Sequence, residues 1–142
     1  MATYNKINQF TEDLGKGVHN FTSGVTGALT YALTTTANKP TAASTVLSGL
    51  TQISYTNLST RVAGFTSFAQ TSGTAKLIVP DLVLTASGTV AAFGAVVLYN
   101  DTPTSPADPL IAWWEYGSDV TLLNTETFTI DTDQSGGVFT IV

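Results

Sequence analysis

The longest apolar run in the chain is Val90-Ala91-Ala92-Phe93-Gly94-Ala95-Val96-Val97-Leu98-Tyr99, and only Gly94 interrupts its hydrophobic side chains. The run is too short to cross a bilayer as a helix, which takes about 20 residues. Continuous apolar residues of this length, rich in β-branched and aromatic side chains, are typical of a strand covered on both faces. We therefore expect residues 90–100 to form a buried strand.

The segments on either side of this run change side-chain character at every second residue, as strands do. Residues 29–34 (Leu-Thr-Tyr-Ala-Leu-Thr) are the clearest example and predict a half-buried strand. Pro80 cannot donate to a ladder, so it places the strand around it at an edge or at a bend. Turn signals recur about every 8–12 residues, which favours a sandwich or jelly roll. Further strands are expected at residues 53–55, 61–70, 76–85, 110–116, 119–123, 126–131 and 138–142.

A helix is expected only in the first residues, where four apolar side chains recur at helical spacing: Tyr4, Ile7, Phe10 and Leu14. Thr3 is the expected N-cap, and Gly15 or Gly17 is the expected end. We find no internal repeat. The sequence therefore predicts one all-β domain over residues 1–142, with a helical segment at 1–17. Residues 25–142 are expected to form a jelly-roll-like β-sandwich of about eight to nine antiparallel strands.

Charged residues make up 11% of the chain, against a usual share of about 25%. The 26 threonines fill much of this deficit, because Thr fits a strand while it presents a hydroxyl group to water. A surface of Thr, Ser and Asn costs less to desolvate than one of Lys and Glu, which suits a protein whose outside becomes buried against neighbours. The alternative is a Thr-rich sandwich that stays monomeric. Because the chain has no cysteine, the fold must hold without disulfides.

The net charge of −5 is unevenly distributed along the sequence. Residues 1–80 contain all five basic side chains and two acidic ones, whereas residues 81–142 contain eight acidic side chains and no basic one. Five cations are too few for a nucleic-acid footprint, so we expect no nucleic-acid partner. The asymmetry favours self-assembly in which the basic part of one copy meets the acidic part of the next. The alternative is that folding interleaves the two parts.

Residues suited to catalysis are sparse. His19 is the only histidine, so a Ser–His nucleophile would depend on it, and a zinc site with three or four N or S ligands cannot be assembled. We interpret His19 as a hydrogen-bonded or solvated loop residue. Five acidic residues could supply the two carboxylates of a glycosidase, but in a β-sandwich such residues usually solvate turns: Glu115, Asp119, Glu126, Asp131 and Asp133. We expect neither an enzyme nor a cofactor.

One acidic motif resembles the first half of a calcium loop. In residues 131–136 (Asp-Thr-Asp-Gln-Ser-Gly), Asp131, Asp133 and Ser135 hold the first, third and fifth positions, and glycine holds the sixth. The twelfth position requires a bidentate Glu but is Val142. The three residues are therefore a weak calcium candidate, and a hairpin turn that reaches positive φ at its Ser and Gly residues is the preferred interpretation.

Aromatic and proline residues supply the candidate contact surface. Trp113 and Trp114 are neighbours in a predicted strand, so their side chains point to opposite faces. If Trp113 faces the core, then Trp114 and Tyr116 face outward, where such pairs anchor interfaces; the alternative is a strand buried on both faces. Prolines stiffen the loop 101–109, which suits a presented contact element. The predicted interface residues are Phe10, Pro103, Pro106, Pro109, Trp114 and Tyr116.

Several segments, spread over nearly the whole chain, resemble small virion proteins of tailed bacteriophages. They are residues 1–10 (Met-Ala-Thr-Tyr-Asn-Lys-Ile-Asn-Gln-Phe), 53–61 (Ile-Ser-Tyr-Thr-Asn-Leu-Ser-Thr-Arg), 97–102 (Val-Leu-Tyr-Asn-Asp-Thr), 109–122 and 126–131. The resemblance implies a capsid decoration (cement) protein with a jelly-roll fold. Such a protein binds the lattice of the major capsid protein and associates with itself as a dimer or trimer. None of the segments carries a reaction.

The resemblance also implies a place on the outer capsid surface of the virion, after synthesis in the host cytoplasm. We expect no membrane partner, because no apolar run is long enough to span a bilayer. Two other roles are open: a tail or fibre component for assembly or host attachment, and, less favoured, a glycan-binding virion module. A tail role predicts few copies per particle and a cement role predicts many. A glycan-binding role predicts an aromatic cleft with two acids.

Overall fold

The computed structural model describes residues 2–22 and 29–142. These residues form nine strands, one α-helix and two short 3-10 helices, which confirms the predicted all-β class. No helix in the described ranges is long and apolar enough to span a membrane. The elements are β1 (Thr3–Lys6), α1 (Asn8–Gly15), β2 (Leu29–Thr34), η1 (Thr36–Asn38), η2 (Leu47–Gly49), β3 (Ser67–Thr71), β4 (Thr74–Ile78), β5 (Leu82–Thr85), β6 (Phe93–Asn100), β7 (Leu110–Val120), β8 (Thr127–Ile130) and β9 (Phe139–Ile141).

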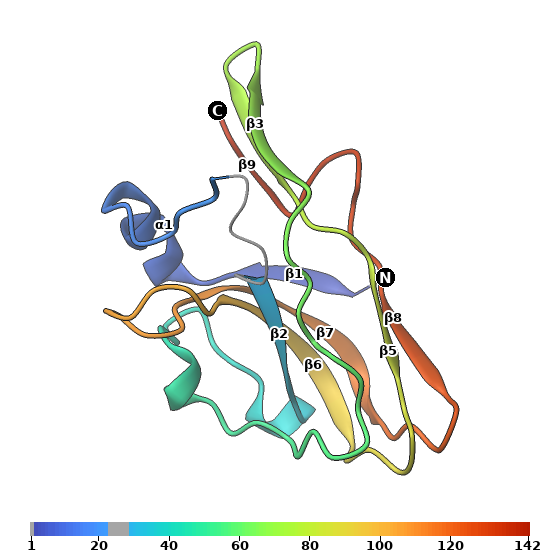
Figure 1. Cartoon of the computed structure of the whole chain (residues 1–142). Helices are drawn as coiled ribbons and strands as arrows, with labels where there is room; N and C mark the ends of the chain where they lie inside the picture. The colour runs from blue at the N-terminus through green and yellow to red at the C-terminus, as the bar shows by residue number, and fades with distance from the viewer. Residues whose placement is uncertain (1, 23–28) are drawn as a thin grey trace.

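The strands form three sheets, and every strand pair is antiparallel (Figure 1). The largest sheet has the order β1-β7-β6-β2, the second has the order β3-β4-β9, and the third consists of β5 and β8. This arrangement confirms an antiparallel β-sandwich. The strand orders do not show a jelly roll, so that finer topology stays a prediction.

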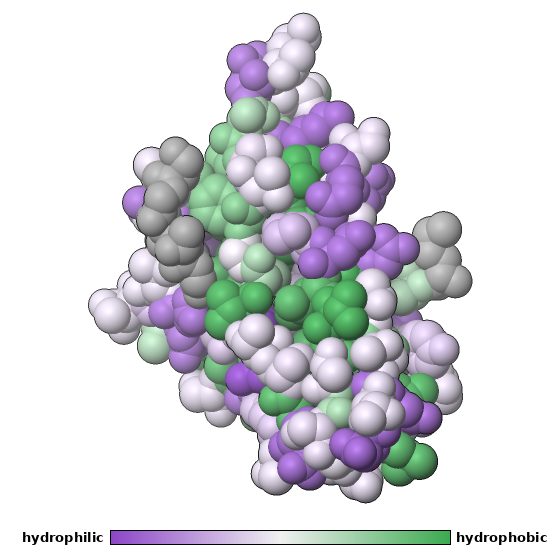
Figure 2. Space-filling model, turned by 45° about the vertical axis from the view of Figure 1, so that its right-hand side comes forward, coloured by the Kyte–Doolittle hydropathy of each residue, from purple (hydrophilic) through white to green (hydrophobic). Residues whose placement is uncertain are grey.

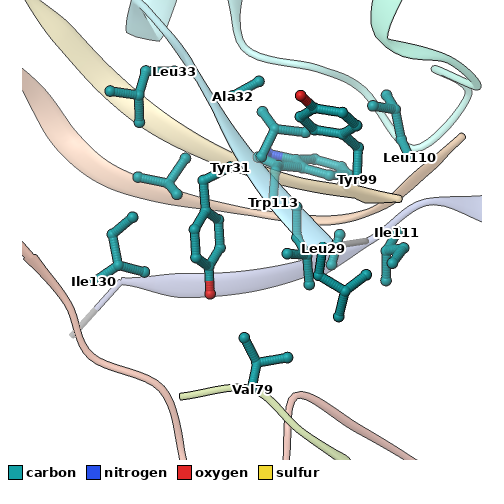
Figure 3. Close-up of a cluster of buried hydrophobic side chains, with 14 of the residues drawn as sticks. Leu29, Tyr31, Ala32, Leu33, Val79, Tyr99, Leu110, Ile111, Trp113 and Ile130 are labelled. Carbon is teal, nitrogen blue, oxygen red and sulfur yellow. The ribbon is translucent and has the colours of Figure 1, made fainter. Parts of the chain in front are cut away.

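The four-stranded sheet is covered on both faces. All eight residues of β6 are buried, as predicted, and so are all six residues of β2. Tyr31 points from one face toward Val79 and Ile130, while Tyr99 and Trp113 lie on the other side of the sheet (Figure 3). The expectation of a half-buried strand at residues 29–34 is therefore wrong. Its threonines are buried because the long segment after β2 folds back over that face.

The N-terminal segment differs from the predicted helix. Residues Thr3–Lys6 form a strand on the edge of the sheet, where Tyr4 pairs with Trp114. Helix α1 begins only at Asn8, so Tyr4 is outside it and Thr3 does not cap it; the N-cap is Ile7, which makes no side-chain cap hydrogen bond. The edge of β7 offers a ladder of backbone partners that a single helical turn cannot match. The predicted start of the sandwich at residue 25 lies outside the described residues.

The predicted strand at 53–55 is absent from the described part of the chain, and only the second half of the predicted strand at 61–70 is a strand, as the beginning of β3. Residues 53–55 and 61–66 run beside β2 without a ladder: the Ile53 N–H donates to the Leu33 carbonyl, and the Tyr31 N–H donates to the Arg61 carbonyl. Of the predicted strand at 119–123, only Asp119 and Val120 are in a strand, as the end of β7. The predicted strand at 76–85 divides at Pro80 into β4 and β5, as a residue without an N–H requires.

We expect Gly94→Ala to lower the free energy of unfolding by about 1–3 kcal/mol, because overpacking forces neighbouring groups to move. A Cβ at residue 94, beside an irregularity in the β6–β7 register, would lie 2.9 Å from the Ser118 carbonyl oxygen. It would also collide with the Asp119 carboxylate, which accepts the Thr36 N–H at 2.7 Å. Urea denaturation measures the loss. Gly49→Ala, where the added carbon meets nothing, is the control and should change stability little.

Candidate contact site

A groove between the end of β7 and strand β8 is lined by three aromatic side chains, of which Tyr116 is exposed and Trp114 and Phe128 are half-buried. Its volume is about 450 Å³. The floor comes from the four-stranded sheet and one wall comes from β8, with the residue before β1 at the rim. The lining residues are Ala2, Val96, Trp114, Tyr116, Thr127, Phe128, Thr129, Ile130, Asp131 and Thr132.

Edge-to-face aromatic contacts fix the shape of the groove. The Tyr116 and Phe128 rings lie 5.7 Å apart, and Phe128 in turn packs on Phe93 at 5.1 Å. Tyr116 is 58% exposed, although it belongs to the same strand as four fully buried or nearly buried residues. Protein interfaces are usually anchored by large aromatic side chains that are held in a fixed orientation and are exposed to solvent before binding. The groove is therefore a candidate contact site.

Trp114 takes an intermediate position between the two interpretations made from the sequence. It is half-buried, and its ring packs edge-on against Tyr31 at 6.4 Å and Tyr4 at 5.7 Å. Trp114 therefore lines the groove without being fully exposed, because β8 partly covers that face of the sheet. Trp113, on the opposite face, is 7% exposed. Tyr116 is exposed as predicted, since β7 continues past the layers that cover its first half.

The other predicted contact residues do not join this groove. Phe10 is 3% exposed and packs against His19 and Phe139 inside the protein, so it offers no contact surface. Pro106 is exposed, Pro103 is half-buried and Pro109 is buried. These prolines precede the first residue of β7, whereas Tyr116 is six residues further on, a distance of about 20 Å along a strand. The chain thus has two separate candidate contact regions, the groove and the proline loop 101–109.

His19 lies in a loop, as predicted, but it is buried and only one of its ring nitrogens is hydrogen-bonded. Its ring stacks parallel to Phe21 at 5.8 Å, and its Nδ1 atom lies 3.4 Å from the Asn100 amide nitrogen. The Nε2 atom has no hydrogen-bond partner among the described residues. Burial lowers the pKa of His19 to about 4, although the nearby Asp13 carboxylate opposes this shift. A histidine that is neutral at pH 7 and buried among aromatic rings serves packing here.

The acidic motif at residues 131–136 forms a turn that uses its own carboxylate. The Asp133 Oδ1 atom accepts the backbone N–H groups of Ser135 at 2.8 Å and Gly136 at 2.7 Å. These two hydrogen bonds hold the pKa of Asp133 below its ordinary value. The turn joins β8 to β9, which belong to different sheets, so the predicted hairpin is wrong. Within residues 2–22 and 29–142, no three His, Cys, Asp or Glu side chains are grouped as metal ligands.

The carboxylates proposed for a glycosidase do not meet in the groove. The Lys39 ammonium contacts both Glu115 oxygens at 2.8 Å, on the face of β7 opposite Trp114. Among the described lining residues, Asp131 is the one carboxylate at the groove. A glycosidase needs two carboxyl groups that flank one bond. The groove therefore supports binding by contact better than hydrolysis.

The uneven charge of the sequence survives folding in part. The Lys39–Glu115 ion pair joins the two halves, as does the Lys76 ammonium, which donates to the Ser135 carbonyl at 3.2 Å. Strand β8 is different, because Glu126 and Asp131 flank it and no basic side chain of the described residues contacts either. The space-filling view, coloured by hydropathy, shows hydrophobic patches among areas of intermediate and hydrophilic character (Figure 2). No protein-family model, curated protein or solved structure matches the chain.

Proposed function

We propose that this chain is a structural protein of a tailed-bacteriophage virion, which binds the capsid shell as a decoration (cement) protein. The likeness of its sequence segments to small phage virion proteins suggests the particle. The observation that carries a contact role is the solvent-exposed aromatic groove, in which Tyr116 is 58% exposed and packs edge-to-face with Phe128. The low charge of the surface lowers the cost of desolvating it against a neighbour.

The proposed action is mechanical. A cement protein spans the joints between capsid subunits, and each added contact raises the work needed to separate them. A standard interface buries about 1,600 Å² in total, and many copies on one lattice bind with avidity, so each contact can be modest. Two contact regions near opposite ends of β7, the groove and the proline loop, suit a chain that connects two neighbours.

Particles that lack this chain should lose infectivity at a lower temperature, or after a milder osmotic shock, than wild-type particles. Adding the purified chain back should restore their resistance. The expectation follows because the shell loses the contacts that bridge its subunits. Equal resistance with and without the chain would contradict the cement role. The number of copies per particle, measured from a stained gel of purified virions, tests the tail or fibre alternative. That alternative predicts a few copies per particle.

Tyr116→Ser should lower the amount of purified chain that binds to stripped particles by roughly tenfold or more, as loss of an interface anchor does. Leu123→Ser is the matched control, because Leu123 is 55% exposed but does not line the groove. Its binding should stay near the wild-type level. Equal binding by both variants would remove the groove from the proposed contact. A glycan-array experiment with Trp114→Ala tests the less favoured glycan-binding role.

A further inference from the structure

The groove follows the backbone edge of β8, a strand that pairs only with β5 (Figure 1). Six consecutive residues, 127–132, line the groove. Successive side chains of a strand point to opposite faces, so a space that touches six neighbours in a row runs along the edge of the strand. Phe128 and Ile130 point toward the four-stranded sheet, where Phe128 packs on Phe93 and Ile130 is buried.

The backbone groups on this edge are free to pair with another strand. The Ala86 N–H donates to the Glu126 carbonyl at 2.9 Å, in register with the β5–β8 pairing. Hydrogen-bonded pairs alternate along an antiparallel ladder, so the backbone groups of Thr127, Thr129 and Asp131 point away from β5. These three residues are exposed, and no described residue hydrogen-bonds to their outward groups. An edge of this kind is a template for a further strand.

A strand added to this edge turns alternate side chains toward the aromatic floor of the groove. In an antiparallel ladder, the side chains of directly opposite residues lie on the same face. The residues opposite Phe128 and Ile130 therefore point toward the four-stranded sheet, where Val96, Trp114 and Tyr116 line the groove. Apolar side chains at these two positions remove apolar surface from water, including that of Tyr116, which is 58% exposed.

The charge at the groove favours a cation at one end of the added strand. Asp131 is the one charged residue among the described lining residues, and no basic side chain in the described ranges pairs with it. The Thr132 N–H donates to the Asp81 carboxylate on the β5 side at 2.9 Å, so the alternation of β8 continues through Asp131. A residue directly opposite Asp131 shares its face, with about 4.5–5.5 Å between Cβ atoms. A Lys or Arg in that place forms an ion pair.

The chain itself has no free segment of the pattern that this edge requires. An antiparallel partner has a cation opposite Asp131, followed by large apolar side chains one and three residues later. Of the five basic residues, only Lys76 is followed in this way, by Leu77 and Val79. Lys76 lies in β4, the central strand of its sheet, which pairs with β3 on one edge and with β9 on the other. The segment must therefore come from a different protein.

We propose that the groove binds an extended segment of another protein, which adds to the outer edge of β8 as an antiparallel strand. Read from its N-terminal end, the segment has a cation, an apolar, a polar, an apolar and a polar residue. The cation pairs with Asp131, and the two apolar side chains cover Trp114 and Tyr116. Antiparallel pairing is chosen because it is slightly more stable per residue than parallel pairing. The inference rests on the proposed function, since it names the chemistry of the partner that this contact site takes.

A heteronuclear NMR titration of the full chain with the end-blocked synthetic peptide Lys-Val-Thr-Val-Thr tests the pairing, up to about 1 mM peptide so that weak binding is visible. The amide signals of Thr127, Thr129 and Asp131 should shift most, because their N–H groups gain hydrogen-bond partners. The peptide Lys-Val-Val-Thr-Thr is the matched control. It has the same composition but turns its two valines to opposite faces in every register, so it should bind about tenfold more weakly.

Variants of β8 test the cation and the backbone pairing separately. Asp131→Lys should weaken binding of the first peptide about fivefold and favour Glu-Val-Thr-Val-Thr instead, because like charges directly opposite each other are unfavourable. Glu12→Lys, an equal change of charge on an exposed residue of α1, should leave both affinities unchanged. Thr129→Pro removes an outward N–H without breaking the β5 ladder, so it should abolish peptide binding while the far-UV circular dichroism spectrum stays the same.

Three results would overturn the proposal: unshifted β8 amides at the highest peptide concentration, equal binding of the two Lys peptides, or a chain that self-associates through β8 and so protects these amides without peptide. If Thr129→Pro binds stripped phage particles as well as the wild type does, strand addition is overturned and the cement role stands. If the wild-type chain binds the peptide but no particle, strand addition is supported and the cement role is overturned.

Discussion

Replacing Tyr31 with alanine should lower the free energy of unfolding by about 3–5 kcal/mol, the range for removing a large buried aromatic side chain. Tyr31 is fully buried on β2, and its ring packs against Trp114 and points between Val79 and Ile130 (Figure 3). The substitution therefore opens a cavity between the four-stranded sheet and the layer of β5 and β8. Urea denaturation, monitored by tryptophan fluorescence, measures the loss of stability. The groove beside Trp114 should change shape as well.

The matched variant Tyr31→Phe should keep or raise stability. The Tyr31 hydroxyl is buried and has no hydrogen-bond partner among the described residues. Removing a buried polar group that lacks a partner relieves a desolvation cost of about 1–3 kcal/mol. A loss of more than about 1 kcal/mol in Tyr31→Phe, the net worth of a typical hydrogen bond, would show that the hydroxyl is bonded in the folded protein.

Alkaline pH gives a second measurement on the same side chain. Burial raises the pKa of Tyr31 strongly above its ordinary value of 10.0. The unfolded chain therefore loses the Tyr31 proton at lower pH than the folded chain does. The stabilisation that the Tyr31 hydroxyl contributes is fully present below about pH 10 and is lost as the pH rises further. The free energy of unfolding should decline less steeply with pH in Tyr31→Phe, because its phenyl ring cannot ionise.

The fold class could be predicted from side-chain order, but the partners of each strand could not. The unbroken apolar residues of β6 identify a strand with both faces covered, and that prediction is confirmed. Residues 53–55 alternate as a strand does, yet they make one backbone hydrogen bond to Leu33. Alternation reports that one side of a segment is buried. It does not report whether a second strand lies within hydrogen-bonding distance along its length.

The same limit applies to the candidate site: its aromatic residues could be predicted from the sequence, but the segments that cover them could not. Adjacent aromatic residues at 113 and 114 showed that two faces of β7 carry tryptophan, because successive strand residues alternate. The cover over each face comes from segments far away in sequence, with β8 on one side and Lys39 on the other. No local pattern contains that information. The burial of His19 was missed for the same reason, since Asn100 approaches it from 81 residues further along the chain.

Lowering the pH from 7 to 4 should cost the protein about 2–3 kcal/mol of stability through His19 alone, at 1.36 kcal/mol per unit of pKa shift. Burial among Phe10, Phe21 and Asn100 lowers the pKa of His19 to about 4, from an ordinary value of 6.5. The unfolded chain therefore binds a proton below pH 6.5 that the folded chain does not accept until about pH 4. The stability is present above pH 6.5 and is lost as the pH falls through this window.

Because His19 is the only histidine, a proton NMR titration of the native protein reports its pKa without assignment. A midpoint near 6.5 would contradict the burial argument directly. His19→Gln supplies the matched control: it loses packing at every pH but has no imidazole to titrate, so its stability should fall less steeply between pH 6.5 and 4. The Asp13 carboxylate favours the protonated imidazole. Asp13→Asn should therefore lower the pKa of His19 further and shift the end of the acid-sensitive window below pH 4, which the same titration would detect.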